Sequence, residues 1–122
     1  MHQTWAYEDG SDKLINLGYA TAKDMFSDIQ NAYKIAAQEI KADAIIPSGQ
    51  AMLNAIKMGI EKIHRDTFHA SLGTGRYLLA LTWYKAVTGK DITNNSFNNF
   101  DVFVNDKERE IVIRAVNSTF RV

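Results

Sequence analysis

The amino-acid sequence predicts an α/β domain in which helices flank a parallel β-sheet. Apolar residues recur at intervals of three and four between Thr21 and Ile40, which is the period of an amphipathic helix. The short apolar run "AII" that ends at Pro47 fits a strand buried on both faces. A second helical pattern begins directly after it. The order helix, buried strand, helix is typical of a parallel α/β sheet.

The first half of the chain predicts one further strand and contains the start signals of the two helices that flank the "AII" run. The aromatic run "HQTWAY" (residues 2–7) predicts a strand that is closed by the turn-forming residues "EDGSD". Thr21 and Asp24 predict a variant capping box at the start of the first helix. Ser48 is expected to cap the second helix. We place the buried stripe of that helix at Met52, Ala55, Ile56 and Ile60.

The second half predicts two more helices separated by a polar loop. One helix runs from about Tyr77 to Gly89, which suits the left-handed position after a helix end. It is apolar nearly all round, so we expect it to be largely buried. The loop is "DITNNSFNNF" (91–100), and "DVFV" follows as a short extended piece. Asn105 and Glu108 predict a capping box for the last helix. The stripe of this helix comprises Ile111, Val112, Ala115 and Val116.

Composition limits the classes of partner and chemistry. With 122 residues the chain suits one domain with one core. Fourteen basic and fourteen acidic residues balance, so we predict neither a nucleic-acid partner nor a charged membrane partner. The absence of cysteine excludes disulfides and thiolate chemistry. The start shows no signal peptide and no run is long enough to span a membrane. We expect a cytoplasmic chain as written, although a longer parent protein could be exported.

The stretch "HRDTFHASLGTGRY" (64–77) holds the most reactive combination of side chains. Asp66 and His69 are three residues apart, so on a turn they share a face. A carboxylate there can orient an imidazole as a general base. Spacing alone leaves two alternatives open: a helix cap beside a surface histidine, and a metal site that adds His64, which the five-residue gap between the histidines disfavours. Gly73 and Gly75 match no phosphate loop, and we expect them to permit close packing of the helix.

The segments "HQTWAY", "AAQEIKADAIIPSGQA" and "DTFHASLGTGRYLLALTWYKAVTG" resemble the SGNH (GDSL-like) serine hydrolase superfamily, in particular a bacterial branch described as a domain of unknown function. The resemblance implies a single domain over 1–122. Residues 1–90 would be the carboxyl-terminal half of a doubly wound, flavodoxin-like parallel sheet, and 91–122 a loop and a last helix. His69 would be the general base and Asp66 its orienting partner. The implied substrate is an acyl ester, carbohydrate esters included, and no cofactor or metal is implied.

The sequence departs from that superfamily because the blocks that carry the nucleophile and the oxyanion hole are absent. None of the serines has the expected context: Ser11, Ser27, Ser48, Ser71, Ser96 and Ser118. Ser71 follows His69 too closely to be its nucleophile, so a capping role is expected. The chain should therefore be a poor esterase by itself. The alternative is a non-catalytic remnant or interaction module that self-associates through the uncovered sheet face.

Three further expectations concern partners and individual side chains. We predict a homo-oligomer or a separate amino-terminal half that covers the exposed apolar face. Trp5 and Tyr7, at the carboxyl end of the predicted strand, would line the substrate cleft, with core packing as the alternative. His2 and His64 are expected to be solvated, and Arg76 to form a surface ion pair.

Overall fold

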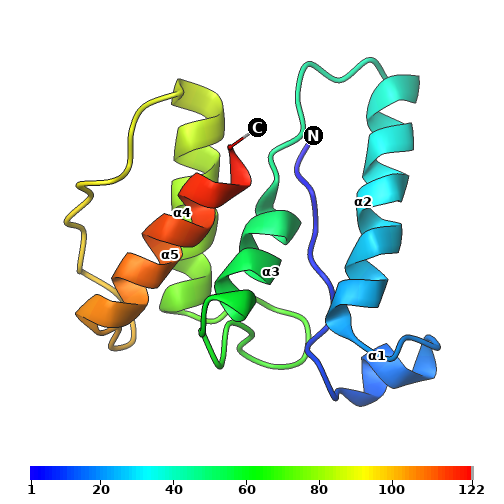
Figure 1. Ribbon diagram of the computed structural model, residues 1–122, viewed down its shortest axis with the longest axis horizontal. Helices are drawn as coiled ribbons and strands as arrows, with labels where there is room; N and C mark the ends of the chain where they lie inside the picture. The colour runs from blue at the N-terminus through cyan, green and yellow to red at the C-terminus, as the bar shows by residue number, and fades with distance from the viewer. Residues whose placement is uncertain (122) are drawn as a thin grey trace.

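Five α-helices, joined by extended segments and loops, make up the part of the chain that the computed structural model describes, residues 1–121 (Figure 1). α3, α4 and α5 lie together, whereas α2 stands on the other side of the extended amino-terminal segment. The helices are α1 (Asp12–Asn16), α2 (Ala22–Glu39), α3 (Ser48–Lys57), α4 (Thr74–Thr88) and α5 (Asp106–Thr119). None of the helices within residues 1–121 is long and apolar enough to cross a membrane.

The predicted parallel β-sheet, and with it the half of a doubly wound sheet, is wrong. Helices account for 51% of the chain and strand for 3%. Residues 1–121 contain two isolated bridges, the parallel pair His2 with Ile46 and the antiparallel pair His64 with Ala70. The two extended segments do lie side by side, since the Gln3 amide donates to the Ile46 carbonyl (3.0 Å). Yet one short pair without a third strand does not build a sheet. The fold is therefore mostly helical.

The local helix signals are largely confirmed. Thr21 accepts a hydrogen bond from the Asp24 amide (3.1 Å) at the start of α2. Asn105 accepts from the Glu108 amide (2.8 Å), and its own amide group donates to the Glu108 carboxylate (2.7 Å), which completes the capping box of α5. α4 ends at Gly89 in the left-handed conformation (φ 69°). These features depend on neighbours in sequence, which explains why the sequence predicts them.

Two local details differ from expectation. Ser48 is the first residue of α3, not its cap, and its Oγ pairs with Nε2 of His2 (2.8 Å). Pro47 takes the cap position without a side-chain hydrogen bond. The turn "EDGSD" also starts a helix that we did not predict: Ser11 caps α1 by accepting from the Leu14 amide (3.4 Å).

The main core lies between α3, α4 and α5. All four predicted stripe residues of α5 are buried there. α4 is less buried than expected for a helix that is apolar nearly all round, because Trp83, Tyr84 and Val87 are exposed by 43%, 45% and 70%. A smaller cluster of Ala6 and Phe26 joins α2 to the amino-terminal segment.

The predicted packing role of Gly73 and Gly75 is confirmed. A Cβ atom at Gly73 would lie 2.6 Å from a methyl group of Val104, and one at Gly75 would lie 2.8 Å from the Ile63 carbonyl oxygen. Both distances are shorter than a real Cβ contact. These glycines therefore allow the start of α4 to lie against the loops that precede and follow it.

Candidate active site

The loop between α3 and α4 carries Asp66 and His69, and its two ends are held together by backbone hydrogen bonds. The Arg65 amide donates to the His69 carbonyl (2.8 Å), and the Ser71 amide donates to the Ile63 carbonyl (2.8 Å). A hairpin-like turn results, with both side chains of the pair about half exposed. The turn therefore presents the Asp66–His69 pair to solvent.

Asp66 binds the turn with one carboxylate oxygen and the imidazole with the other. Its Oδ1 accepts hydrogen bonds from the amides of Phe68 (2.9 Å) and His69 (2.7 Å). Its Oδ2 accepts from Nδ1 of His69 (2.6 Å). The predicted sharing of a face by Asp66 and His69 is thus confirmed. The two backbone hydrogen bonds to Oδ1 orient the carboxylate so that Oδ2 lies towards the imidazole.

Electrostatics determine how the proton is placed in this pair. The backbone amide of His69, then its imidazole and then the Phe68 amide hold the pKa of Asp66 well below its usual value. An ionised carboxylate only accepts hydrogen bonds, so Nδ1 of His69 must carry the hydrogen between them. In the neutral ring Nε2 then has the lone pair, and it makes no hydrogen bond within residues 1–121. This nitrogen can accept a proton from a neighbouring group.

Aromatic side chains lie on one side of the Asp66–His69 pair. The Phe68 ring lies against the His69 ring, with 4.0 Å between their centroids. Tyr7 meets Phe68 edge to face at 6.4 Å, and the Trp5 indole N–H donates to the Phe68 carbonyl (2.7 Å). The structure therefore brings Trp5 and Tyr7 to the loop of the Asp66–His69 pair. Their role in substrate binding stays a prediction. No sequence pattern singles out Phe68, because its position depends on contacts with Trp5 and Tyr7 of the amino-terminal segment.

No serine within residues 1–121 forms a hydrogen bond with His69. The Ser71 hydroxyl accepts from the Gly75 amide (2.8 Å) and pairs with Thr74 (3.0 Å), which is the capping role expected for it. Ser48 pairs with His2, but Ser48 is fully buried (0% exposed), so it cannot reach a substrate. Burial also lowers the pKa of His2. Within the described residues the Asp66–His69 pair therefore has no serine hydroxyl as a hydrogen-bond partner.

His64 belongs to the core and not to the Asp66–His69 pair. It is 2% exposed, against the expectation of a solvated ring, and its Nε2 donates to the Ala6 carbonyl (2.9 Å). Its Nδ1 lies 3.9 Å from the Glu8 carboxylate. The described part of the chain brings no three His, Cys, Asp or Glu side chains together in a metal-binding arrangement.

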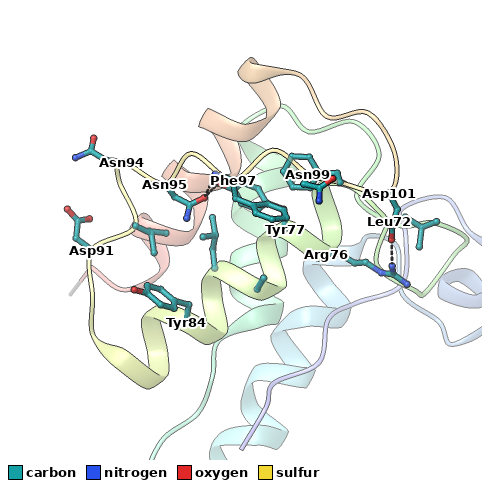
Figure 2. Close-up of a pocket in the computed structure, with 14 residues that line it drawn as sticks. Leu72, Arg76, Tyr77, Tyr84, Asp91, Asn94, Asn95, Phe97, Asn99 and Asp101 are labelled. Carbon is teal, nitrogen blue, oxygen red and sulfur yellow. Dashed lines mark hydrogen bonds and ion pairs between the residues drawn. The ribbon is translucent and has the colours of Figure 1, made fainter.

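A second feature, a cavity of about 810 Å³, lies between α4 and the loop that follows it (Figure 2). Arg76 and Asp101 form an ion pair at one end of it (2.9 Å), which confirms the expected pairing of Arg76. The sequence predicts only a polar loop for residues 91–100. The interleaving of asparagine with phenylalanine in "NNSFNNF" is the signal that could have indicated a binding surface.

Comparison with known proteins gives a family without a function. Residues 1–119 match the family described as "Domain of unknown function (DUF4886)". The crystal structure of a DUF4886 family protein from Bacteroides uniformis is similar over 97% of this chain, with a TM-score of 0.83 and 31% sequence identity. The chain covers 46% of that protein and so spans about half of its length. None of the curated proteins compared with the chain matches it.

These matches and the helical fold overturn the assignment to the SGNH superfamily. The matched family and the matched structure are both DUF4886, and the parallel sheet that the superfamily requires is absent from residues 1–121. The coarser expectation, a domain of unknown function, is confirmed. By a match that extends over nearly its whole length, this chain belongs to the DUF4886 family.

Proposed function

We propose that Asp66 and His69 are the general-base pair of an acyl-ester hydrolase whose nucleophilic hydroxyl comes from outside residues 1–122. One observation supports this most strongly. Nδ1 of His69 lies 2.6 Å from an Asp66 oxygen, while Asp66 Oδ1 accepts two backbone hydrogen bonds. That arrangement fixes the ring and leaves Nε2 of the half-exposed His69 side chain without a hydrogen-bond partner within residues 1–121. Orienting an imidazole by a carboxylate is how serine-type hydrolases activate their nucleophile.

In the proposed reaction the proton moves through Nε2 of His69. The imidazole takes the proton from the hydroxyl as the hydroxyl oxygen bonds to the acyl carbon. It then returns that proton to the leaving alkoxide as the ester bond breaks. A water molecule then attacks the acyl-enzyme in the same way, with His69 as its base. The carboxylic acid is released and the proton returns to the nucleophilic hydroxyl. Asp66 stays ionised throughout and stabilises the imidazolium. Phe68, Trp5 and Tyr7 would form the apolar wall beside the reacting group.

Two observations support an external nucleophile. Ser71, the serine nearest to His69 in sequence, uses its hydroxyl for hydrogen bonds at the start of α4. In addition, the Bacteroides uniformis protein has roughly as much sequence outside the matched region as inside it. An adjoining or separate polypeptide segment could therefore bring the hydroxyl to the exposed His69 ring.

The test is hydrolysis of p-nitrophenyl acetate by the chain. We expect a slow rate, because neither nucleophile nor oxyanion hole is in place, and we expect His69→Ala to remove most of it. His2→Ala is the matched control, since it removes the half-buried imidazole that pairs with Ser48. A His69→Ala variant as active as the unmodified chain, or an equal loss in His2→Ala, would show that the pair does not act as the base.

A second experiment tests the source of the nucleophile. The chain is treated with a fluorophosphonate, which bonds covalently to activated serines, and is analysed by mass spectrometry. No adduct is expected on residues 1–122. An adduct on Ser71 or another serine of the chain would contradict an external nucleophile.

A further inference from the structure

The cavity between α4 and residues 91–101 is separate from the proposed reaction and has the features of a ligand site. Its volume of about 810 Å³ lies within the range of pockets that hold small molecules. Figure 2 shows α4 along one side and the loop, running from Asp91 to Asp101, along the other. Neither the Asp66–His69 pair nor its aromatic neighbours line it.

The floor of the cavity is apolar and carries accessible aromatic rings. Leu81 and Ile92 are buried at its base, with 5% and 2% exposure. Tyr84 and Phe97 also line it and remain 45% and 51% exposed. Large rings left open to water within one concave surface indicate a surface that a partner covers.

The rim is rich in side-chain amides. Asn94, Asn95 and Asn99 all line the cavity. The Oδ1 of Asn95 accepts from the Tyr77 hydroxyl (2.7 Å), and burial raises the pKa of that hydroxyl, so it stays a donor. The amide NH₂ of Asn95 is then left to donate. The side chains of Asn94 and Asn99 make no hydrogen bond within residues 1–121, so each offers a donor and an acceptor to a ligand.

The charges of the rim exclude an anionic ligand. Arg76 is neutralised by Asp101 at 2.9 Å. Asp91, which also lines the cavity, accepts hydrogen bonds from Thr93 and leaves the rim with a negative balance. A phosphate or carboxylate would meet this unfavourable potential. The uncharged side-chain amides of the rim suit a neutral ligand that can donate and accept hydrogen bonds.

The loop is anchored, so the cavity exists before a ligand binds. Arg109 on α5 donates to the carbonyls of Phe97 (2.9 Å) and Asn95 (3.1 Å). The Phe100 ring packs edge to face against Tyr77 and Phe97, at 5.1 and 5.2 Å. A wall held in this way loses little conformational entropy on binding.

We propose that this cavity binds a neutral sugar, a mono- or disaccharide unit. The C–H faces of a sugar ring would lie on Tyr84 and Phe97, and its hydroxyls would pair with the amides of Asn94, Asn95 and Asn99. A sugar uses both features at once, because it combines apolar C–H faces with hydroxyls that donate and accept hydrogen bonds. The proposal does not rest on ester hydrolysis, because the binding of an unmodified sugar needs no reaction.

The proposal is tested by titrating the ¹⁵N-labelled chain with cellobiose, maltose, lactose and chitobiose. We expect at least one sugar to shift the side-chain amide signals of Asn94 and Asn99. Asn99→Ala and Phe97→Ala should each weaken that binding about tenfold, as expected for the loss of one hydrogen bond or one ring contact.

Two matched controls lie on the same loop outside the cavity. Asn98 is exposed, and Phe103 is 89% exposed, and neither lines the cavity. Asn98→Ala and Phe103→Ala should bind as the unmodified chain does, and circular dichroism checks that all four variants fold. No shift with any of the four sugars would overturn the proposal. So would equal weakening by the control variants, or shifts with adenosine but with no sugar.

Discussion

At the scale of single residues, the role of Asp66 could not be settled from the sequence. Spacing predicted that its carboxylate would reach His69, but a helix cap and a catalytic partner both remained open. In the structure Asp66 caps no helix: one of its oxygens binds the backbone of the α3–α4 turn and the other binds the imidazole, while a catalytic role stays a prediction. Phe68 and His64 could not be placed from the sequence. Their partners, Trp5 and Ala6, lie far away in the chain.

Because the pKa of Asp66 is lowered in the folded chain, we expect its hydrogen bonds to stabilise the turn at pH values below the ordinary aspartate pKa. The ionised form is favoured in the folded chain, so its contribution to stability is present above the ordinary aspartate pKa of about 3.9 and is lost only as the pH falls towards the lower folded value. We expect the ¹³C signal of the Asp66 carboxylate to titrate below the ordinary range. A midpoint at the ordinary value would contradict the hydrogen bonds described.

The Ser71 hydroxyl should matter for stability and not for hydrolysis. Ser71→Ala removes the acceptor of the Gly75 amide, so the free energy of unfolding should fall by about 1 kcal/mol. Denaturant unfolding measures this change. The hydrolysis that depends on His69 should be unaffected. A loss of that hydrolysis in a folded Ser71→Ala variant would mean that Ser71 is more than a cap.

At the scale of elements, helix ends were predictable and the relation between extended segments was not. Thr21, Asn105 and Gly89 act on their own neighbours, so short patterns identified them. The run that ends at Pro47 was apolar enough for a buried strand, yet Ile45 and Ile46 are only half-buried. A strand depends on its partners, and residues 1–121 provide a single bridge for this one.

Packing of α3 against the amino-terminal segment depends on Gly49. A Cβ atom there would lie 2.1 Å from the Thr4 carbonyl oxygen and 2.4 Å from the Phe26 ring. Gly49→Ala should therefore lower the free energy of unfolding by about 1–3 kcal/mol, despite the better helix propensity of alanine. Asn31→Ala, at an exposed position of α2, should change it by less than about 0.5 kcal/mol. Comparable effects of the two substitutions in urea unfolding would contradict this close packing.

At the scale of the whole molecule, apolar surface remains exposed on α2. Ile35 is 49% exposed, and Ile40, just after the helix end, is 65% exposed. The sequence predicted an uncovered apolar face, but it assigned that face to a sheet that residues 1–121 do not form. The expectation of a homo-oligomer or a further half of the protein accordingly stays a prediction, and the exposed isoleucines Ile35 and Ile40 offer one surface for such a partner.

Self-association can be measured by size-exclusion chromatography with light scattering. We expect a species larger than the 13.7 kDa chain, because burying exposed isoleucines is favourable. Ile35→Lys with Ile40→Lys should shift the population towards monomer, whereas Lys34→Ala should not. A well-folded monomer at every concentration would rule out self-association.

If Asp66 holds His69 with Nε2 free as a base, the neutral imidazole of His69 must be in the tautomer that carries its hydrogen on Nδ1. Long-range ¹H–¹⁵N correlation spectra identify which ring nitrogen carries the hydrogen in the neutral form. We expect hydrogen on Nδ1, facing the Asp66 carboxylate, and a loss of this preference in Asp66→Asn. Hydrogen on Nε2 in the unmodified chain, or a tautomer ratio that Asp66→Asn leaves unchanged, would contradict it.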